Sequence, residues 1–185
     1  RLSIHLLVAF IILSIVFWKF LQLSNVKITQ SSYELFWFKF FIFLLFLQLI
    51  VGALVSGMDA GKVYNTWPLM GSSFFPDDSI MKEFLSTKLF DNPSITQFIH
   101  RNLAYLIIII YIILLIGVLK NRNPIFLKPI LIIGLSLLIQ IILGIFTILS
   151  GVKILYASLH QINSIFIILS TLYFLYISQH KEKVN

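Results

Sequence analysis

Residues 95–119 read ITQFIHRNLAYLIIIIYIILLIGVL, an apolar run long enough to decide the fold. An α-helix needs about 20 apolar residues to cross the roughly 30 Å hydrocarbon core of a membrane. Further runs of similar character lie at residues 2–23, 35–56, 127–149 and 154–178. The sequence therefore predicts an all-α polytopic membrane protein with five transmembrane helices.

The overall composition also indicates a chain embedded in lipid. Apolar residues make up 59% of it and charged residues only 11%, and the mean hydropathy is +0.98. Because the sequence has no cysteine, it excludes disulfides, thiolate-bound zinc, iron–sulfur clusters and thioether-attached haem. The net charge of +7 comes from basic residues near the ends of the apolar runs, so we predict no nucleic-acid binding.

The positions of lysine and arginine predict the orientation in the membrane. The side that we expect to be cytoplasmic carries a group of basic residues in short segments: Lys19, Lys27, Lys120, Arg122, Lys128, Lys181 and Lys183. The long loop at residues 57–94 has more acidic than basic residues, and we expect it to face the periplasm or the intermembrane space.

Three histidines fall in the outer layer of this topology: His5, His100 and His160. An ionisable side chain inside a membrane is costly unless it has a partner, so each is a candidate functional residue. Zinc needs three or four ligands, whereas haem needs two axial ligands and an apolar pocket. The sequence therefore favours a bis-histidine haem on His100 and His160, and the alternatives are hydrogen-bonded buried histidines or a proton pathway. Arg101 either meets a haem propionate or anchors its helix at the interface.

A short pattern occurs twice, as Gln48-x-x-x-Gly52 and as Gln140-x-x-x-Gly144. It represents either helix packing through small residues or a duplication in which His5 and His100 precede the two glutamines by similar distances. In the outer loop, Ser94-x-x-Gln97 has the form of a capping box. Residues 79–90 suit an interfacial helix or an ordinary anchored loop.

Several motifs together resemble haem A synthase, in the branch of that family without loop cysteines. They are GMDAGKVYNTWPLM at 57–70, QFIHRNLAY at 97–105, Gln140 through Gly144, and Leu159-His160-Gln161. The resemblance covers nearly the whole chain. It implies an eight-span fold made of two four-helix halves, in which this chain supplies the fourth span and the C-terminal half, and spans one to three are absent.

The resemblance further implies that the enzyme oxidises the methyl group of haem O to the formyl group of haem A for terminal oxidases. It implies haem b between His100 and His160, and it matches His5 to one of the two histidines of the substrate-haem site. The other substrate-site histidine lies in the absent spans, so we expect the chain by itself to be inactive. The implied partners are haem O, oxygen or water, an electron donor, haem O synthase and oxidase assembly factors.

The resulting organisation is the last span of an N-terminal half at 1–23, a cytoplasmic linker at 24–34, a haem-binding bundle at 35–178 and a polar cytoplasmic tail at 179–185. We expect a bacterial plasma membrane, with a mitochondrial inner membrane as the alternative, and the haem site on the outer side. In the outer loop, a polar and aromatic cluster either covers the haem edge or receives an electron donor: Asp59, Lys62, Tyr64, Asn65 and Trp67. For Tyr64 and Trp67 the alternative is a place in the interfacial aromatic belt. Two alternatives to the enzyme are a b-type cytochrome that only relays electrons and a non-redox transporter or scaffold.

Overall fold

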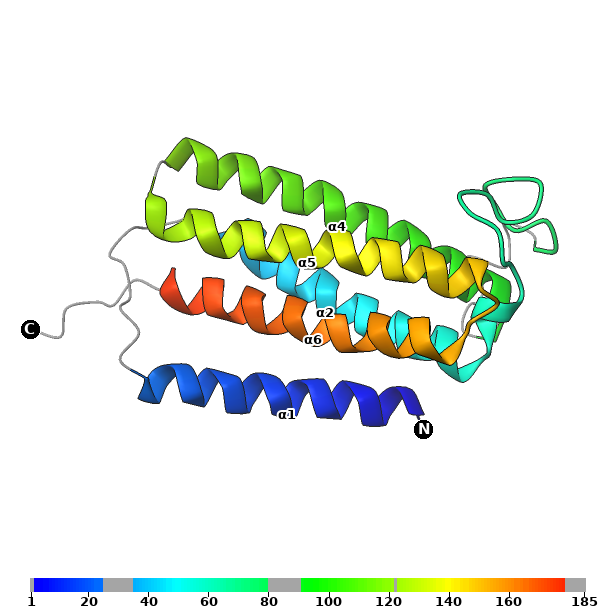
Figure 1. The fold of residues 1–185 in the computed structure, drawn as a ribbon, viewed down its shortest axis with the longest axis horizontal. Helices are drawn as coiled ribbons and strands as arrows, with labels where there is room; N and C mark the ends of the chain where they lie inside the picture. Colours follow the sequence, from blue (N-terminus) through cyan, green and yellow to red (C-terminus); the bar gives the residue numbers. More distant parts are fainter. Residues whose placement is uncertain (1, 25–34, 80–90, 122, 179–185) are drawn as a thin grey trace, which may run out of the picture.

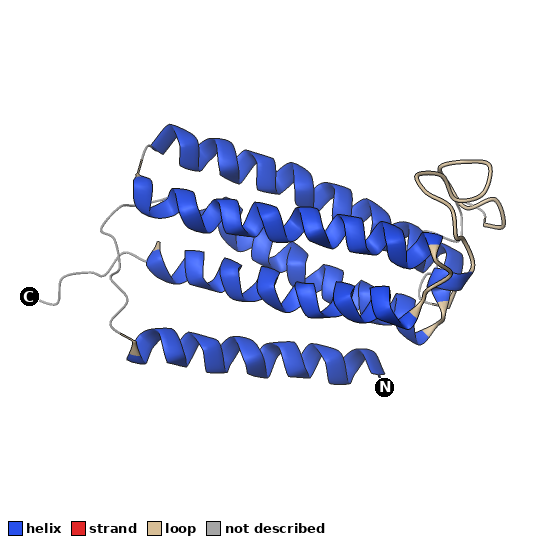
Figure 2. Cartoon of the chain, viewed as in Figure 1, coloured by secondary structure: helices blue, strands red, loops and turns tan. Residues whose placement is uncertain are grey.

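The computed structural model describes residues 2–24, 35–79, 91–121 and 123–178 (Figure 1). The long helices are α1 (Leu2–Leu23), α2 (Leu35–Gly57), α4 (Pro93–Asn121), α5 (Pro124–Leu149) and α6 (Ile154–Ile177), with a short 3₁₀ helix η1 (Ala60–Lys62). Among the described residues, five helices are long and apolar enough to cross a membrane, which confirms the predicted all-α membrane fold with five spanning helices. Within the described ranges the other residues form loops (Figure 2). These loops contain one isolated β-bridge, between Met70 and Ser73.

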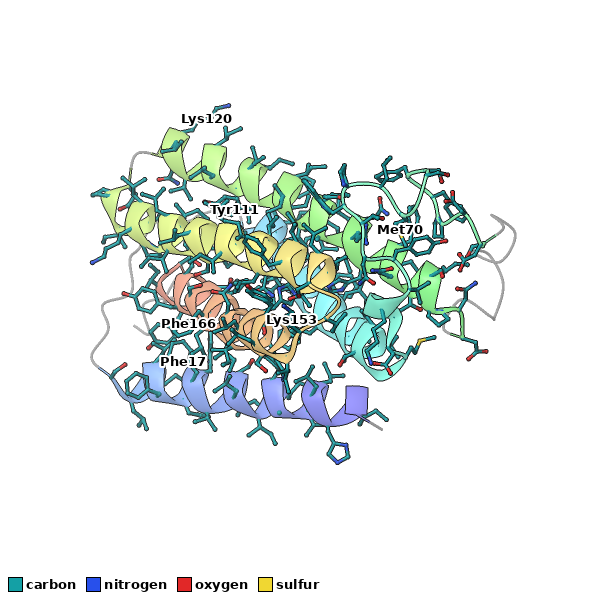
Figure 3. All side chains as sticks on the ribbon, turned by 45° about the vertical axis from the view of Figure 1, so that its right-hand side comes forward. Phe17, Met70, Tyr111, Lys120, Lys153 and Phe166 are labelled. Atoms are coloured by element: carbon teal, nitrogen blue, oxygen red, sulfur yellow. The ribbon has the colours of Figure 1, made fainter. Side chains whose placement is uncertain are left out.

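Four of the helices form a bundle in which α4 and α6 lie diagonally opposite each other. Helix α5 lies on one side of this diagonal and α2 on the other, and α1 packs at the edge against α2 and α6 (Figure 1). We call the end of the bundle that carries residues 57–79 the loop end. Figure 3 shows Met70 at this end and Lys120 at the opposite end of α4. Helices α1, α4 and α6 all begin at the loop end, so His5, His100 and His160 lie in the first turns of their helices there.

Aromatic packing holds the bundle together at the end opposite the loop end. Phe38 of α2 stacks on Phe174 of α6 with ring centroids 4.4 Å apart, and Phe126 of α5 contacts the same ring at 5.3 Å. All three side chains are fully buried. Because lipid is as apolar as these residues, close packing rather than exclusion of water provides the attraction between the helices.

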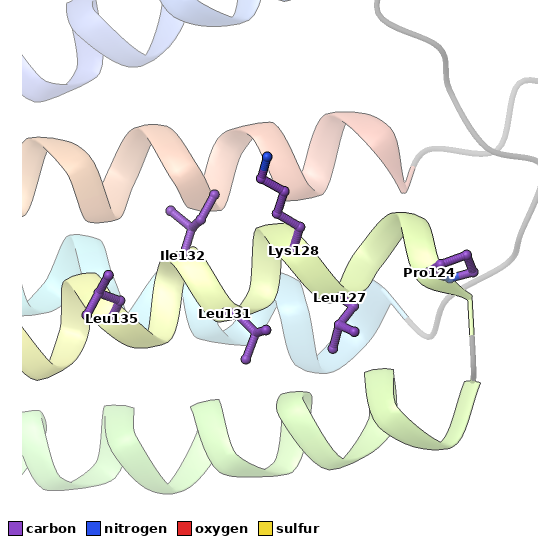
Figure 4. Close-up of a pocket in the computed structure, with 6 residues that line it drawn as sticks. All are labelled: Pro124, Leu127, Lys128, Leu131, Ile132 and Leu135. Carbon is purple, nitrogen blue, oxygen red and sulfur yellow. The ribbon is translucent and has the colours of Figure 1, made fainter.

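The outward faces of the helices are apolar and suit contact with lipid. Ile12, Leu135 and Phe166 are among many large exposed hydrophobic side chains. A shallow groove on α5 belongs to the same surface (Figure 4). It is lined by Pro124, Leu127, Lys128, Leu131, Ile132 and Leu135. This groove begins at the first residue of α5, at the end remote from the histidines, and does not belong to the site described below.

The start of α4 differs from the predicted capping box. The side-chain oxygen of Asn92 accepts hydrogen bonds from the backbone N–H groups of Ser94 at 3.0 Å and Ile95 at 3.3 Å, and Pro93 is the first helical residue. Asparagine is a strong N-cap and proline is favoured at the first position of a helix, so this pair begins the helix. The capping-box prediction was therefore wrong. The predicted interfacial helix at 79–90 lies, except for Ser79, outside the described residues.

Residues 71–79 form a compact turn around Asp77. Its carboxylate accepts hydrogen bonds from the Ser72 backbone N–H at 2.8 Å and from the hydroxyls of Ser72 and Ser73. Gly71 has a φ of +80°, and a Cβ at this position would overlap the Asp77 carboxylate, so the turn requires glycine. The Ser72 N–H, together with the two hydroxyls, holds the pKa of Asp77 below its usual range.

Candidate functional site

The site lies between α4 and α6, inside the bundle and near its loop end. His100 on α4 and His160 on α6 are both partly buried, near the loop end of two helices that share α2 and α5 as neighbours. His5 on α1 is exposed on the edge of the bundle. The structure thus brings two of the three predicted histidines together and leaves the third outside their site.

His100 rests against a glutamine and a glycine of α2. The Gln48 side-chain nitrogen lies 3.4 Å from His100 Nε2 and also donates a hydrogen bond to the His100 backbone carbonyl at 3.1 Å. A Cβ on Gly52, one turn further along α2, would lie 3.0 Å from the Cε1 atom of the imidazole. The glycine therefore provides the space in which the ring packs.

His160 rests in the same way against a glutamine and a glycine of α5. The Gln140 side-chain nitrogen lies 3.2 Å from His160 Nε2, and a Cβ on Gly144 would lie 3.1 Å from the Cε1 atom. The two arrangements repeat each other, with Gln-x-x-x-Gly on one helix and histidine on the next. The sequence interpretation placed His5 with Gln48 and His100 with Gln140, whereas the structure pairs His100 with Gln48 and His160 with Gln140. The repeat therefore forms two halves of one site.

The His160 half has further polar contacts. His160 Nδ1 lies 3.1 Å from the Gln140 backbone carbonyl, to which it donates when protonated. The Asn163 amide donates to the Gln140 side-chain oxygen at 2.7 Å and to the Ser136 carbonyl at 2.8 Å. A histidine that donates from Nδ1 to a carbonyl keeps a lone pair on Nε2, which is the form that binds a metal.

The His100 half contains polar atoms without a hydrogen-bond partner. Among the described residues, four buried side-chain atoms have none, and all belong to this half: Gln48 Oε1, Gln97 Oε1, His100 Nδ1 and Arg101 Nε. Buried polar atoms are usually satisfied, so an unpaired group of this kind calls for an explanation by water, an ion or a ligand. The two halves thus share a sequence pattern, but among the described residues the buried polar atoms without a hydrogen-bond partner lie in the His100 half.

Arg101 is only 8% exposed and holds the outer loop. Its guanidinium nitrogens Nη1 and Nη2 donate to the backbone carbonyls of Leu69 and Tyr64, each at 3.3 Å. The predicted contact with a haem propionate stays a prediction, and the visible role of the residue is to join α4 to the loop.

The residues present fit a haem with two axial histidines. Two Nε2 atoms come from helices that lie diagonally across the bundle, and glycine gives each ring its space. Leu103 and Ile107 follow His100 on the same face of α4, and Ile167 follows His160 on α6, so buried apolar side chains continue from both rings. Among the described residues, no group of three or more histidine, aspartate or glutamate side chains could hold a metal ion. Two imidazoles match the number of protein ligands that a haem needs.

Asn163, Ser136 and the two glycines were missed as site residues by the sequence analysis. Asn163 lies three residues after His160, so it lies on the same face of the helix. That position was a usable signal for a polar partner. The close approach of Gly52 and Gly144 to the imidazoles depends on which helices are neighbours, and the sequence pattern does not contain this information.

The chain matches one protein-family model and several curated proteins. The model of the COX15-CtaA family, described as cytochrome oxidase assembly protein, matches residues 1–172. The chain is 43% identical over 167 residues to the haem A synthase of Pelagibacter ubique, a match that covers 90% of this chain and 49% of that protein. It is 38% identical over 172 residues to the haem A synthase of Rickettsia bellii, with 90% and 51% covered. For the haem A synthase of Wolbachia pipientis the identity is 37% over 171 residues, with 90% and 47% covered. The chain thus spans about half the length of the curated relatives it matches. No solved structure matches it.

Proposed function

This chain belongs to the COX15-CtaA family of cytochrome oxidase assembly proteins, and from that premise we propose that it forms the haem b-binding bundle of a haem A synthase. The resemblance seen in the sequence is confirmed at the level of the family. The observation that carries the proposal is the pair of matching histidine arrangements on α4 and α6. His100 and His160 are the proposed axial ligands.

The proposed work of the bundle is to hold a haem in a fixed orientation away from water. His160 would keep its lone pair on Nε2, because its Nδ1 donates to the Gln140 backbone carbonyl. Asn163 holds the Gln140 side chain, whose nitrogen lies 3.2 Å from this Nε2. Gly52 and Gly144 let both rings sit close to their supporting helices. When bound, the haem would supply one-electron transfer, and the protein would supply its position and electrostatic surroundings.

The proposed reaction of the whole protein is the oxidation of the haem O methyl group to the formyl group of haem A. Replacing two hydrogens of a methyl group by one oxygen atom is a four-electron oxidation, so oxygen or water and an electron carrier are required partners. We place the substrate haem near His5, which lies at the loop end on the exposed edge of the bundle. The chain covers about half the length of its relatives, so we propose this substrate and these partners for the whole protein.

The proposed location is a bacterial plasma membrane, with the loop end on the outer side. Lys19, Lys120 and Lys128 lie toward the opposite end of the described bundle, as expected for the cytoplasmic side. The proposed organisation keeps residues 35–178 as the haem-binding bundle, with α1 as a span of the other half.

A chimera tests the proposed activity. The chain is joined to the part of the Pelagibacter ubique relative that it does not match, and is expressed in cells that make haem O. Haems extracted from the membranes are then separated by chromatography and identified by mass. We expect haem A from the chimera and none from its His100→Ala or His160→Ala variants. A chimera that binds haem but forms no haem A would contradict the synthase and favour an electron-relaying cytochrome. A chimera without haem would favour a non-redox role.

A further inference from the structure

The loop at residues 58–69 connects the two halves of the site across the loop end of the bundle. On the α4 side, the Tyr64 carbonyl accepts hydrogen bonds from the Gln97 side chain at 3.0 Å and from Arg101 Nη2 at 3.3 Å. The Leu69 carbonyl accepts from Arg101 Nη1 at 3.3 Å. Gln97 and Arg101 lie one turn apart on the helix that carries His100, so the loop is fastened directly beside this histidine.

The same loop is fastened to the other half by Asn65. The Asn65 side-chain amide donates to the carbonyls of Ile148, in the last turn of α5, and Gly61, both at 3.0 Å. Gly61 also lies close to the turn that follows α5, since a Cβ there would be 3.0 Å from Val152 Cγ2. This turn leads directly into α6, which carries His160.

Helices α4 and α6 are separated by the diagonal of the bundle, and α2 and α5 lie between them (Figure 1). Their separation at the loop end therefore depends on the helices between them and on any connection across that end. Residues 58–69, which we call the strap, form such a connection: α4 binds the carbonyl of Tyr64, and the next residue, Asn65, binds α5.

We propose that the strap sets the separation of the His100 and His160 rings, and that Asn65 is the positioning residue which closes it. The inference rests on the proposed haem function for one of its two tests. The haem ligands are His100 and His160, and Asn65 acts on them only through the helices. If the strap merely covered the bundle, loss of Asn65 would lower stability and leave the separation unchanged.

The first test needs no haem. Because the sequence has no cysteine, Leu106→Cys on α4 and Leu155→Cys on α6 give a single pair of spin labels, at positions that are 39% and 62% exposed. Double electron–electron resonance then measures their separation in Asn65→Ala and in the parent. We expect a shift or broadening of roughly 1–2 Å, the usual scale of helix displacements. The matched control is Asn123→Ala, which loses the side-chain cap of α5 at the opposite end.

The second test uses the chain loaded with haem b. The low-spin ferric electron paramagnetic resonance signal depends on the orientation of two axial imidazoles, and haem loss to apomyoglobin reports how well they hold iron. We expect Asn65→Ala to alter the signal and to lose haem roughly two- to tenfold faster, the scale of one or two hydrogen bonds. Asn65→Asp, which removes the donor, has at least this effect, and Asn65→Gln restores part of the parent behaviour.

These tests separate the failure of the strap from the failure of the proposed function. If the unsubstituted chain takes up no haem, the haem function fails while the label distances still test the strap. If Asn65→Ala and Asn123→Ala give the same distances as the parent, the strap does not set the separation and the proposal is wrong. The same conclusion follows if both variants change the distances equally.

Discussion

The His100 and His160 halves of the site have the same sequence pattern but are supported by different contacts. In each half, Gln-x-x-x-Gly on one helix receives a histidine from the next. The His160 half is completed within its own two helices, because Asn163 engages Gln140 and Gln140 engages the ring. The His100 half has unpaired polar atoms and depends on the outer loop through Gln97 and Arg101. A shared pattern therefore builds the pocket, while different neighbours determine how rigidly each ring is held.

The largest expected difference between the halves follows substitution of the glycines. Gly52→Ala and Gly144→Ala each place a Cβ about 3 Å from an imidazole carbon, and overpacking of this kind costs about 1–3 kcal/mol. Because the His160 ring is hydrogen-bonded at both nitrogens and yields less easily, we expect Gly144→Ala to lower haem affinity more than Gly52→Ala. Titration of haem into the purified variants measures this. Equal losses of haem affinity in the two variants would show that the two imidazole rings are held equally rigidly.

A second test removes the amide that supports Gln140. Asn163→Ala leaves the Gln140 side-chain oxygen without its 2.7 Å partner, and an unsatisfied buried acceptor costs about 1–3 kcal/mol. We expect a lower thermal midpoint and weaker haem binding. Ser164→Ala is the control, since its hydroxyl bonds only to Gln161 of the same helix. If both variants behave alike, the Asn163 network does not support the ring.

The two glutamines provide a smaller and more direct comparison. Gln140→Leu removes a side chain whose oxygen and nitrogen both have partners, in Asn163 and His160. Gln48→Leu removes a side chain whose nitrogen contacts His100 but whose oxygen has no partner. Replacing the fully paired amide should cost about 1 kcal/mol more than replacing the half-paired one. Thermal unfolding of both variants in the same detergent measures the difference. The account predicts the greater loss for Gln140→Leu, and the reverse order would contradict it.

The smallest expected effect is a pH dependence confined to the loop. Burial opposes the ionisation of Asp78, but hydrogen bonds, led by that from Ser94 on α4 at 2.7 Å, outweigh it and hold its pKa below the usual range. The stabilisation is therefore complete above the ordinary aspartate pKa of about 3.9 and is lost as the pH falls through the lower pKa of the folded protein. Hydrogen exchange should show the loop opening in acid while the His160 half stays protected.

Ser94→Ala sharpens the pH test because it removes the leading hydrogen bond to Asp78. The carboxyl pKa should rise toward its ordinary value, so that part of the stabilisation is absent at every pH. The remaining transition should then lie at higher pH than in the parent. A loop that opens at the same pH in both proteins would show that the Ser94 contact does not contribute.

The sequence predicted the helices and the histidine pair because both depend on local signals. A long apolar run specifies a spanning helix by itself, and an imidazole in such a run, as at His160, is conspicuous. The cap of α4 was predicted two residues too late because Asn92-Pro93 competes with Ser94 and Gln97 for the same helix start. Gln97 then has a different role, as a donor to the Tyr64 carbonyl.

The partners of the repeated motif could not be predicted because they depend on helix order in space. Gln48 and His100 are far apart in sequence and meet only because α2 and α4 are neighbours. The role of Asn65 in joining the loop to α5 is likewise a contact between distant segments. Asn163 is the exception, since its spacing from His160 placed it on the same helical face and could have identified it.

The optical spectrum of the purified chain, recorded oxidised and reduced and as the pyridine haemochrome, tests whether His100 and His160 hold a haem. We expect about one b-type haem per chain in the low-spin state, as two histidine ligands require. In His100→Ala and in His160→Ala the haem should be lost or become high-spin. A parent chain that binds haem and keeps the same low-spin spectrum in either variant would contradict the assignment of these two histidines as the ligands.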